Sequence, residues 1–206
     1  MALIGNFPTD PGFTSVNFRQ QTKTQKTETN SGRTIRYTDS TTLWKGTLNF
    51  PPMTLAEFKP IQGFIARCQG PLNEFDLVIP TVSDTSSGYP NQSTQVNSAG
   101  SAGATSVDVL SNQTSSTILK AGDVVRFPNH SKVYMVTQDV TTDGSGLGVL
   151  NFQPGLVIAV EVYDSAGATI QVNQVPFRMI LTNDLQEFGY RTDGLVGYEL
   201  DVQEVI

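Results

Sequence analysis

Two short apolar segments flank a polar turn in the stretch Asp123-Val124-Val125-Arg126-Phe127-Pro128-Asn129-His130-Ser131-Lys132-Val133-Tyr134-Met135-Val136-Thr137. Both segments are rich in valine and aromatic residues, which favour strands, and the Asn-His-Ser triplet between them is typical of a turn. A third segment of this kind, 148–152, follows the turn residues 143–146. This spacing predicts a compact small β-barrel or β-meander.

The same pattern extends to both sides of this stretch. Alternating or short apolar runs bounded by Pro, Gly or polar turn residues predict further strands at 43–50, 75–79, 105–110, 158–162, 169–172, 177–181 and 198–205. We therefore expect a mainly β chain.

One segment predicts an α-helix, at 55–68. Thr54 and Glu57 have the spacing of a capping box, and Gly70-Pro71 ends the pattern. Pro60 inside the segment predicts a kink or a separate first turn. Six apolar residues fall on one helical face, which we expect to be buried: Leu55, Phe58, Ile61, Phe64, Ile65 and Cys68.

The composition changes sharply after Pro80, because residues 81–117 consist mostly of Ser, Thr, Gly, Asn and Gln. The expected strands 75–79 and 177–181 are each flanked by proline on the side of this segment, and we expect them to pair in one sheet. The predicted organisation is a β-rich core domain of residues 1–80 and 176–206, with residues 81–175 as an inserted small β-module that includes a Ser/Thr/Gly-rich linker.

The run 22–29, Thr-Lys-Thr-Gln-Lys-Thr-Glu-Thr, alternates threonine with long polar side chains. It predicts a strand that is polar on both faces, or an extended arm. Such a strand has no apolar face of its own. We therefore expect it to be ordered only against a neighbouring sheet or a neighbouring subunit.

The charge of the chain argues against several functions. Its 206 residues include 13 Lys and Arg against 19 Asp and Glu, for a net charge of -6, which disfavours tight binding to nucleic-acid phosphates or anionic membranes. No signal peptide and no apolar run long enough to span a membrane is recognisable, and Cys68 is the single cysteine. We expect a soluble chain made in a reducing cytoplasm.

The sequence predicts no catalytic, cofactor-binding or metal-binding residues, and no cofactor. His130 has no Gly-x-Ser-x-Gly elbow as a partner and is expected to be a turn or surface histidine. Asp139 and Asp143 form an ordinary loop pattern, not a calcium loop. Four carboxylates are nominal candidates for a glycosidase pair, but any acidic chain supplies such candidates: Glu161, Asp164, Asp184 and Glu187.

Several stretches, in this order, resemble tail structural proteins of tailed bacteriophages, particularly those of marine cyanophages. The first is Trp44-Lys45-Gly46-Thr47-Leu48-Asn49-Phe50-Pro51-Pro52-Met53-Thr54, followed by the helix with Phe58, Pro60 and Phe64 and by Gly70-Pro71-Leu72-Asn73-Glu74-Phe75. Residues 119–136 are similar to an inserted module of those proteins, and Val175-Pro176-Phe177-Arg178-Met179 is similar to their return strand.

The resemblance implies a tail-tube-like β-sandwich or barrel with one flanking helix. It also implies a non-enzymatic virion protein of the tail-tube, distal-tail or baseplate type, assembled in the host cytoplasm as a ring of several copies, six by expectation, around the DNA channel. The implied partners are further copies of the chain and the adjacent tail tube, baseplate or hub proteins. DNA would be only a transient cargo of the lumen, and no membrane would be involved.

Two other classes of function remain open. In the first, the protein is an adhesion or carbohydrate-binding β-module in which residues 81–155 bind the ligand. The second, a hydrolase, lacks any motif in its favour. Trp44 and Tyr134 are expected in the core rather than on a sugar-binding surface, since aromatic residues in strands are more often buried.

Overall fold

The structure is a computed structural model that describes residues 1–162 and 169–206, with the backbone alone at 39–41. The described chain is mainly β and contains one α-helix, which confirms the fold class expected from the sequence. No described helix has the length and apolar character to cross a membrane. Two compact units can be distinguished. The barrel unit comprises Met1–Phe7, Glu74–Met179 and Val205–Ile206, and the hairpin unit comprises Pro8–Asn73 and Ile180–Glu204.

The barrel unit is built around one six-stranded antiparallel sheet, in the order β13-β6-β7-β12-β10-β9. Its strands are β6 (Thr94–Val96), β7 (Ser106–Ser111), β9 (Val124–Arg126), β10 (Val133–Val136), β12 (Leu147–Gln153) and β13 (Thr169–Ile170). A separate pair, β8 (Thr117–Leu119) and β11 (Val140–Thr141), forms a two-stranded sheet.

The six-stranded sheet nearly closes on itself. Arg126, at the end of β9, forms a β-bridge with Gln171, just after β13. Each of the two residues donates its backbone N–H to the other's carbonyl oxygen, at 3.0 and 2.9 Å. Because β9 and β13 are the first and last strands of the sheet, this bridge joins its two edges and gives a nearly closed small barrel, the first of the two forms that the sequence predicted.

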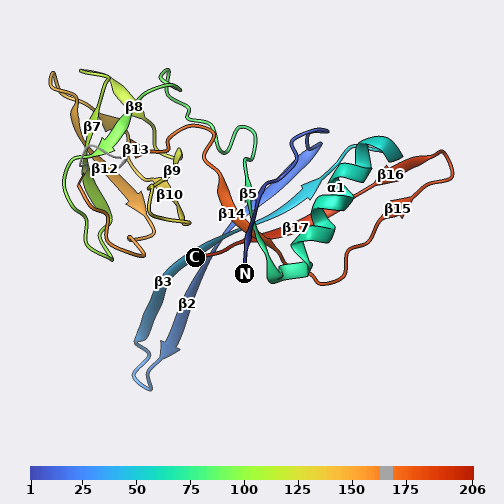
Figure 1. The fold of residues 1–206 in the computed structure, drawn as a ribbon. Helices are drawn as coiled ribbons and strands as arrows, with labels where there is room; N and C mark the ends of the chain where they lie inside the picture. The colour runs from blue at the N-terminus through green and yellow to red at the C-terminus, as the bar shows by residue number, and fades with distance from the viewer. Residues whose placement is uncertain (163–168) are drawn as a thin grey trace. The chain divides into compact units, whose positions relative to one another are not determined.

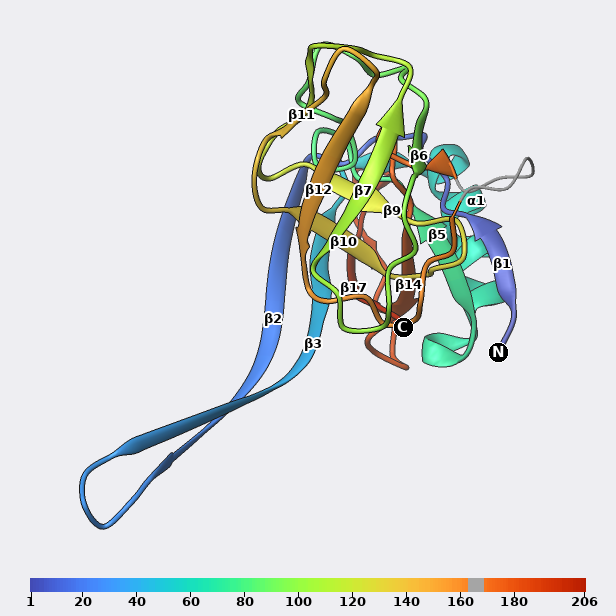
Figure 2. The same cartoon turned by 90° about the vertical axis from the view of Figure 1, so that its left-hand side faces the viewer.

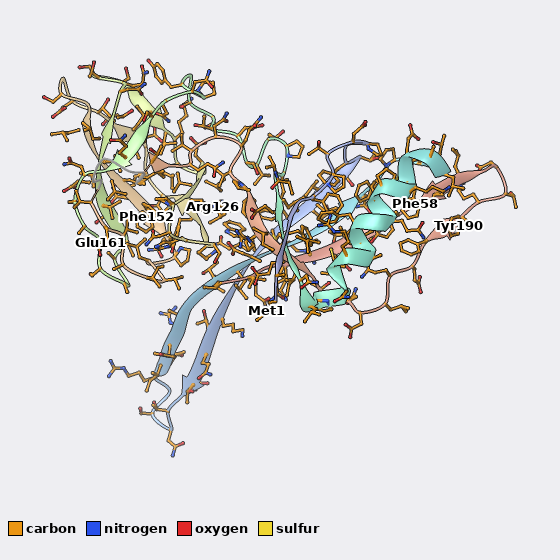
Figure 3. All side chains as sticks on the ribbon, viewed as in Figure 1. Met1, Phe58, Arg126, Phe152, Glu161 and Tyr190 are labelled. Atoms are coloured by element: carbon orange, nitrogen blue, oxygen red, sulfur yellow. The ribbon has the colours of Figure 1, made fainter. Side chains whose placement is uncertain are left out.

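The barrel encloses an apolar core in which three aromatic rings meet edge to face. The ring centroids of Phe127, Tyr134 and Phe152 lie 5.3 to 5.4 Å apart, and all three side chains are almost completely buried. Figure 3 labels Phe152 within this unit. Edge-to-face packing of this kind adds to the stabilisation from burial itself.

Three further strands belong wholly or in part to this unit: β1 (Leu3–Asn6), β5 (Glu74–Leu77) and the first residues of β14 (Phe177–Leu181). β5 pairs in parallel with β1 and antiparallel with β14, with Phe177 opposite Leu77. The expected pairing of 75–79 with 177–181 is therefore confirmed. Arg178 on β14 donates to the carboxylate of Asp76 on β5 at 2.9 Å.

The strand expected at 158–162 was wrong. Only Val160 takes part in a β-bridge, with Gly100. The neighbouring backbone groups are bonded to side chains, since Val157 N–H donates to Tyr134 Oη at 3.1 Å and the Ala159 carbonyl accepts from Asn129 at 2.9 Å. Hydrogen bonds of this kind take the place of a strand ladder.

The hairpin unit contains two sheets. In the first, β3 (Thr34–Asn49) pairs antiparallel with β2 (Ser15–Glu28) on one side and with β17 (Glu199–Glu204) on the other. In the second, β16 (Leu195–Gly197) pairs with β15 (Gly189–Tyr190) and with β4 (Met53–Thr54). A single-turn 3-10 helix, η1 (Gly70–Leu72), follows α1.

The helix α1 (Leu55–Cys68) has the bounds expected from the sequence, and it continues through Pro60 without an interruption. Thr54 and Glu57 form the expected capping box: Thr54 Oγ1 accepts from Glu57 N–H, and Glu57 Oε2 accepts from Thr54 N–H at 2.8 Å. Five of the six expected face residues are buried. Leu55 is the exception, with 46% of its surface exposed, because a residue in the first turn extends beyond the packed face.

The buried face of α1 meets an aromatic cluster. The ring of Phe58 lies 5.3 Å from that of Phe188 and 5.6 Å from that of Tyr198, measured between centroids. Gln62 on α1 donates to the hydroxyl of Tyr190 on β15 at 3.3 Å. Figures 1 and 3 show α1 beside the β15–β16 hairpin, with Phe58 and Tyr190 labelled in Figure 3. These contacts fix the helix against the second sheet.

The domain bounds expected from the composition, 1–80 with 176–206 against 81–175, stay a prediction. The sequence did not predict β6, β8 or β11. Each of these strands has only two or three residues. Strands of this length carry too few alternating positions to be recognised in a sequence.

Substitution of Phe58 by Ala should lower the free energy of unfolding by about 3–5 kcal/mol, because the ring is completely buried. The matched control, Leu55→Ala, removes an exposed apolar side chain from the same helix. It should change the free energy of unfolding by less than about 1 kcal/mol. Urea unfolding followed by circular dichroism measures both. Equal losses in the two variants would contradict the packing described for α1.

Candidate interaction surface

The most unusual feature of the molecule is the β2–β3 hairpin. Its two strands pair from Ser15 opposite Asn49 to Glu28 opposite Thr34, with an irregularity in the register between Thr22 and Thr24. The run 22–29, predicted as a polar strand or an extended arm, therefore forms the outer half of a β-strand. Figure 2 shows both strands continuing to a narrow tip.

Only the base of this hairpin has a third strand. β17 pairs with β3 from Lys45 to Asn49, whereas the outer part of β3, Thr34–Thr42, pairs with β2 alone. We call the outer segment, residues 22–42, the ribbon. The described side chains from Thr22 to Thr38 are exposed, apart from a half-buried Thr29. The ribbon thus has neither a core nor a covering layer within the described part of its own chain.

The base of the hairpin, in contrast, is firmly packed on one face. Phe18 stacks on Trp44 with a centroid distance of 5.0 Å. Between them and β17, a Cβ atom at Gly46 would lie only 3.4 Å from the Phe18 ring and 3.5 Å from Val202. The side chains of Phe18 and Val202 therefore pack at van der Waals distance over this residue of β3.

A short turn closes the ribbon. Gly32 has a φ of 77°, in the left-handed region that favours glycine, and its N–H donates to the carbonyl of Thr29 at 2.8 Å. Thr29 and Arg33 are joined by a backbone hydrogen bond of 2.9 Å. These bonds keep the two strands paired up to the tip.

The arrangement of the ribbon is suited to binding a macromolecule. β2 is the last strand of its sheet, so one row of its backbone N–H and carbonyl groups faces away from β3. Such an edge can pair with a strand of a partner. The side chains of Ile35 and Tyr37 are 53% and 66% exposed and supply apolar contact area on one face of β3.

His130 follows a turn, since its N–H donates to the carbonyl of Phe127 at 3.0 Å, which agrees with one of the two expectations, but the alternative of a surface position was wrong. It is 93% buried, and its ring packs against those of Phe127 and Tyr134. Nδ1 lies 2.6 Å from Tyr134 Oη, which also accepts from Val157 N–H. Burial lowers the pKa of His130, so this histidine is neutral at pH 7 and belongs to the packed barrel.

Cys68 is buried as expected and lies on the packed face of α1. Its Sγ donates to the carbonyl of Phe64, four residues earlier, at 3.4 Å. Burial raises the pKa of the thiol to about 11. A thiol with such a pKa is almost entirely protonated at neutral pH and is a poor nucleophile.

Of the acidic candidates, Asp184 and Glu187 line one open groove of the hairpin unit, whereas Asp139 and Asp143 bind backbone N–H groups of the barrel unit. Asp143 Oδ1 accepts from the N–H groups of Ser145 and Leu147 and thus holds its own turn, while Asp139 accepts from Ala121 N–H. Asp164 lies outside the described residues. Among the side chains of residues 1–38, 42–162 and 169–206, no three His, Cys, Asp or Glu residues are placed to hold a metal ion.

Trp44 and Tyr134 are both buried, as expected, with at most 3% of their surface exposed.

The outer part of β3, which pairs with the run 22–28, was not predicted, although the sequence contains a signal for it. Residues 34–38 alternate Thr-Ile-Arg-Tyr-Thr, and Asn30-Ser31-Gly32 lies between this run and 22–29. Together these two features are typical of a hairpin.

Comparison of the chain with protein-family models gave no match, and comparison with curated proteins gave none either.

The pKa of His130 leads to a testable dependence of stability on pH. A folded-state pKa below that of the unfolded chain means that the unfolded state binds more protons, so stability falls as the pH is lowered through about 6.5. We expect the free energy of unfolding of the wild type to fall more steeply between pH 7 and pH 5 than that of His130→Phe, which keeps a ring but does not titrate. Parallel pH profiles of the two proteins would contradict this account.

Proposed function

We propose that the protein is a non-enzymatic structural component of a bacteriophage tail or baseplate, and that several copies form a ring around the DNA channel. The observation that carries the proposal is the ribbon, which is long, ordered and uncovered. The order of the segments that resemble tail proteins points in the same direction. Further copies of the chain and adjacent tail tube, baseplate or hub proteins are the proposed partners.

The ribbon consists of two strands without a third strand beside them in the described part of the chain. An isolated hairpin is at best marginally stable in water, since it buries little apolar surface. The ribbon is anchored at one end by the packed pair of Phe18 and Trp44, but its outer half gains nothing from that packing. A partner that covers it would supply the missing contacts, and a second copy of the chain is the simplest such partner.

A contact between the ribbon of one copy and a different surface of the next is a head-to-tail contact. Contacts of this type form a closed ring when the rotation between neighbours divides a full turn, and an open filament when it does not. The proposed ring, with six copies as the expectation, is the closed case.

The positions of the reactive side chains support a structural role. The single histidine is a neutral member of the barrel unit, and the single cysteine is a protonated thiol on the buried face of α1. The net charge of -6 per copy supports a channel that repels phosphate at close range and lets DNA pass without holding it.

The carbohydrate-binding alternative has no specific observation in its favour. Stacking on a sugar requires an exposed aromatic ring. In residues 81–155, all of which the structure describes, Phe127, Tyr134 and Phe152 are in the core. Tyr89 is half-buried, and its hydroxyl donates to Ser116 at 3.2 Å.

Shortening the hairpin tests the proposal. In the full-length chain, residues 23–41 are replaced by Asn-Gly, which joins Thr22 to Thr42 across the paired strands in a tight turn. The wild type should form a ring in electron micrographs and a discrete oligomer in sedimentation velocity. The shortened protein should unfold cooperatively, because the described side chains that are removed are exposed or half-buried, but it should sediment as a monomer.

The matched control shortens the other hairpin of the same unit, with residues 192–194 replaced by Asn-Gly, and should assemble like the wild type. A monomeric wild type at every concentration would contradict the ring. A shortened protein that still forms the ring would contradict the role of the ribbon.

A further inference from the structure

The charges of this chain are segregated along the sequence. The segment from Ser15 to Asn49, which forms β2 and β3, holds six of the thirteen Lys and Arg residues but only two of the nineteen Asp and Glu residues. Its net charge is therefore +4, while the remainder of the chain carries -10. An acidic protein thus carries a distinctly basic hairpin.

The register of the hairpin places like charges directly opposite each other. Lys26 on β2 faces Arg36 on β3 in the ribbon, and Arg19 faces Lys45 at the base. Like charges at directly opposite positions destabilise a pair of strands. Two such pairs in one hairpin are unfavourable in the isolated chain, and an anionic partner would convert the repulsion into attraction.

The ribbon pair has no such partner within the described chain. Lys26 and Arg36 are both exposed, and neither forms an ion pair with a described carboxylate. Ile35 and Tyr37, on either side of Arg36, are exposed as well. Because side chains alternate between the two faces of a strand, the ribbon presents the cationic pair on one face and the apolar groups on the other.

A surface of opposite charge lies elsewhere in the hairpin unit. An open groove of about 790 Å3 is lined by residues from Thr182 to Gly189 and by the start of β17, and it contains four carboxylates: Asp184, Glu187, Glu199 and Asp201. Asp184, Glu187 and Glu199 are exposed. Of the four carboxylates, Asp201 accepts a hydrogen bond, from Thr47 at 2.7 Å. Leu185, 74% exposed, adds an apolar contact at the groove.

We propose that the basic ribbon of one copy docks into this acidic groove of a second copy, with Lys26 and Arg36 facing Glu187 and Glu199. The inference rests on the proposed function, because it names the two surfaces that join neighbouring copies. The outer strands, at roughly 3.4 Å per residue, extend more than 20 Å from Thr22 to the turn, which is long enough to reach across to a neighbour.

A nucleic acid is the other anionic macromolecule that a basic ribbon could contact. The observations favour a second copy. The carboxylates needed are present on the same chain, and the groove that holds them also exposes the apolar side chain of Leu185. In addition, the net charge of -10 outside the hairpin opposes the close approach of phosphates.

A charge swap in the full-length protein tests the proposal. The ribbon-reversed variant is Lys26→Glu with Arg36→Glu, and the groove-reversed variant is Glu187→Lys with Glu199→Lys. All four side chains are exposed, so each variant should fold. Sedimentation velocity at low salt should show association weakened by about tenfold or more in each variant, because each places like charges across the contact. The protein with all four changes should regain association.

The matched control, Lys59→Glu with Lys120→Glu, makes the same change in net charge at two exposed lysines outside both surfaces and should associate like the wild type. Salt should weaken the association of the wild type and of the fourfold variant alike, since the attraction between exposed charges is screened.

The outcomes separate this inference from the proposed function. A wild type that stays monomeric contradicts both. An oligomeric wild type whose association is unchanged by ribbon reversal, or is not restored in the fourfold variant, contradicts the docking of ribbon and groove alone. Binding of a duplex oligonucleotide that is lost on ribbon reversal, with assembly unaffected, would identify the ribbon as a nucleic-acid surface and overturn the inference.

Discussion

Backbone hydrogen bonds between β2 and β3 hold the two strands of the ribbon together, and the proposed assembly depends on the ribbon. At the base of the hairpin these bonds are supported by the stacking of Phe18 on Trp44 and by the third strand, β17. From Thr22 to Thr38 they are the main connection between two strand segments whose side chains are exposed, apart from the half-buried Thr29. Water competes for every one of these bonds, so the ribbon has little net stability of its own. A partner surface is the physical means by which such a segment becomes a rigid part of an assembly.

The two units differ in whether the backbone N–H and carbonyl groups at the edges of their sheets are paired. In the barrel unit, the bridge between Arg126 and Gln171 joins the first and last strands, and the side chains inside form an apolar core. In the hairpin unit, β2 stays an edge strand and carries three of the six cationic side chains of the hairpin, namely Arg19, Lys23 and Lys26. A closed barrel suits a stable module, whereas an open edge with charged side chains avoids random aggregation and still permits a specific contact.

The sequence predicted those elements whose signals are local. The helix 55–68 was found because its capping box and apolar period agree, and the pairing of 75–79 with 177–181 followed from their flanking prolines. The exposure of Leu55 and the buried site of His130 depend on tertiary contacts, which a single sequence does not display. The opposition of Lys26 and Arg36 depends on the register of the hairpin, which a polar strand specifies only weakly in its sequence.

Hydrogen exchange at the backbone amides of the ribbon tests the central claim most directly. The full-length protein is measured by mass spectrometry at concentrations below and above its assembly, and the barrel strands serve as an internal reference. The account predicts rapid exchange at residues 23–38 in the dilute protein and strong protection in the assembled protein, with no change in β7 or β12. Exchange in the ribbon that is equally rapid at every concentration, or already slow in the monomer, would contradict it.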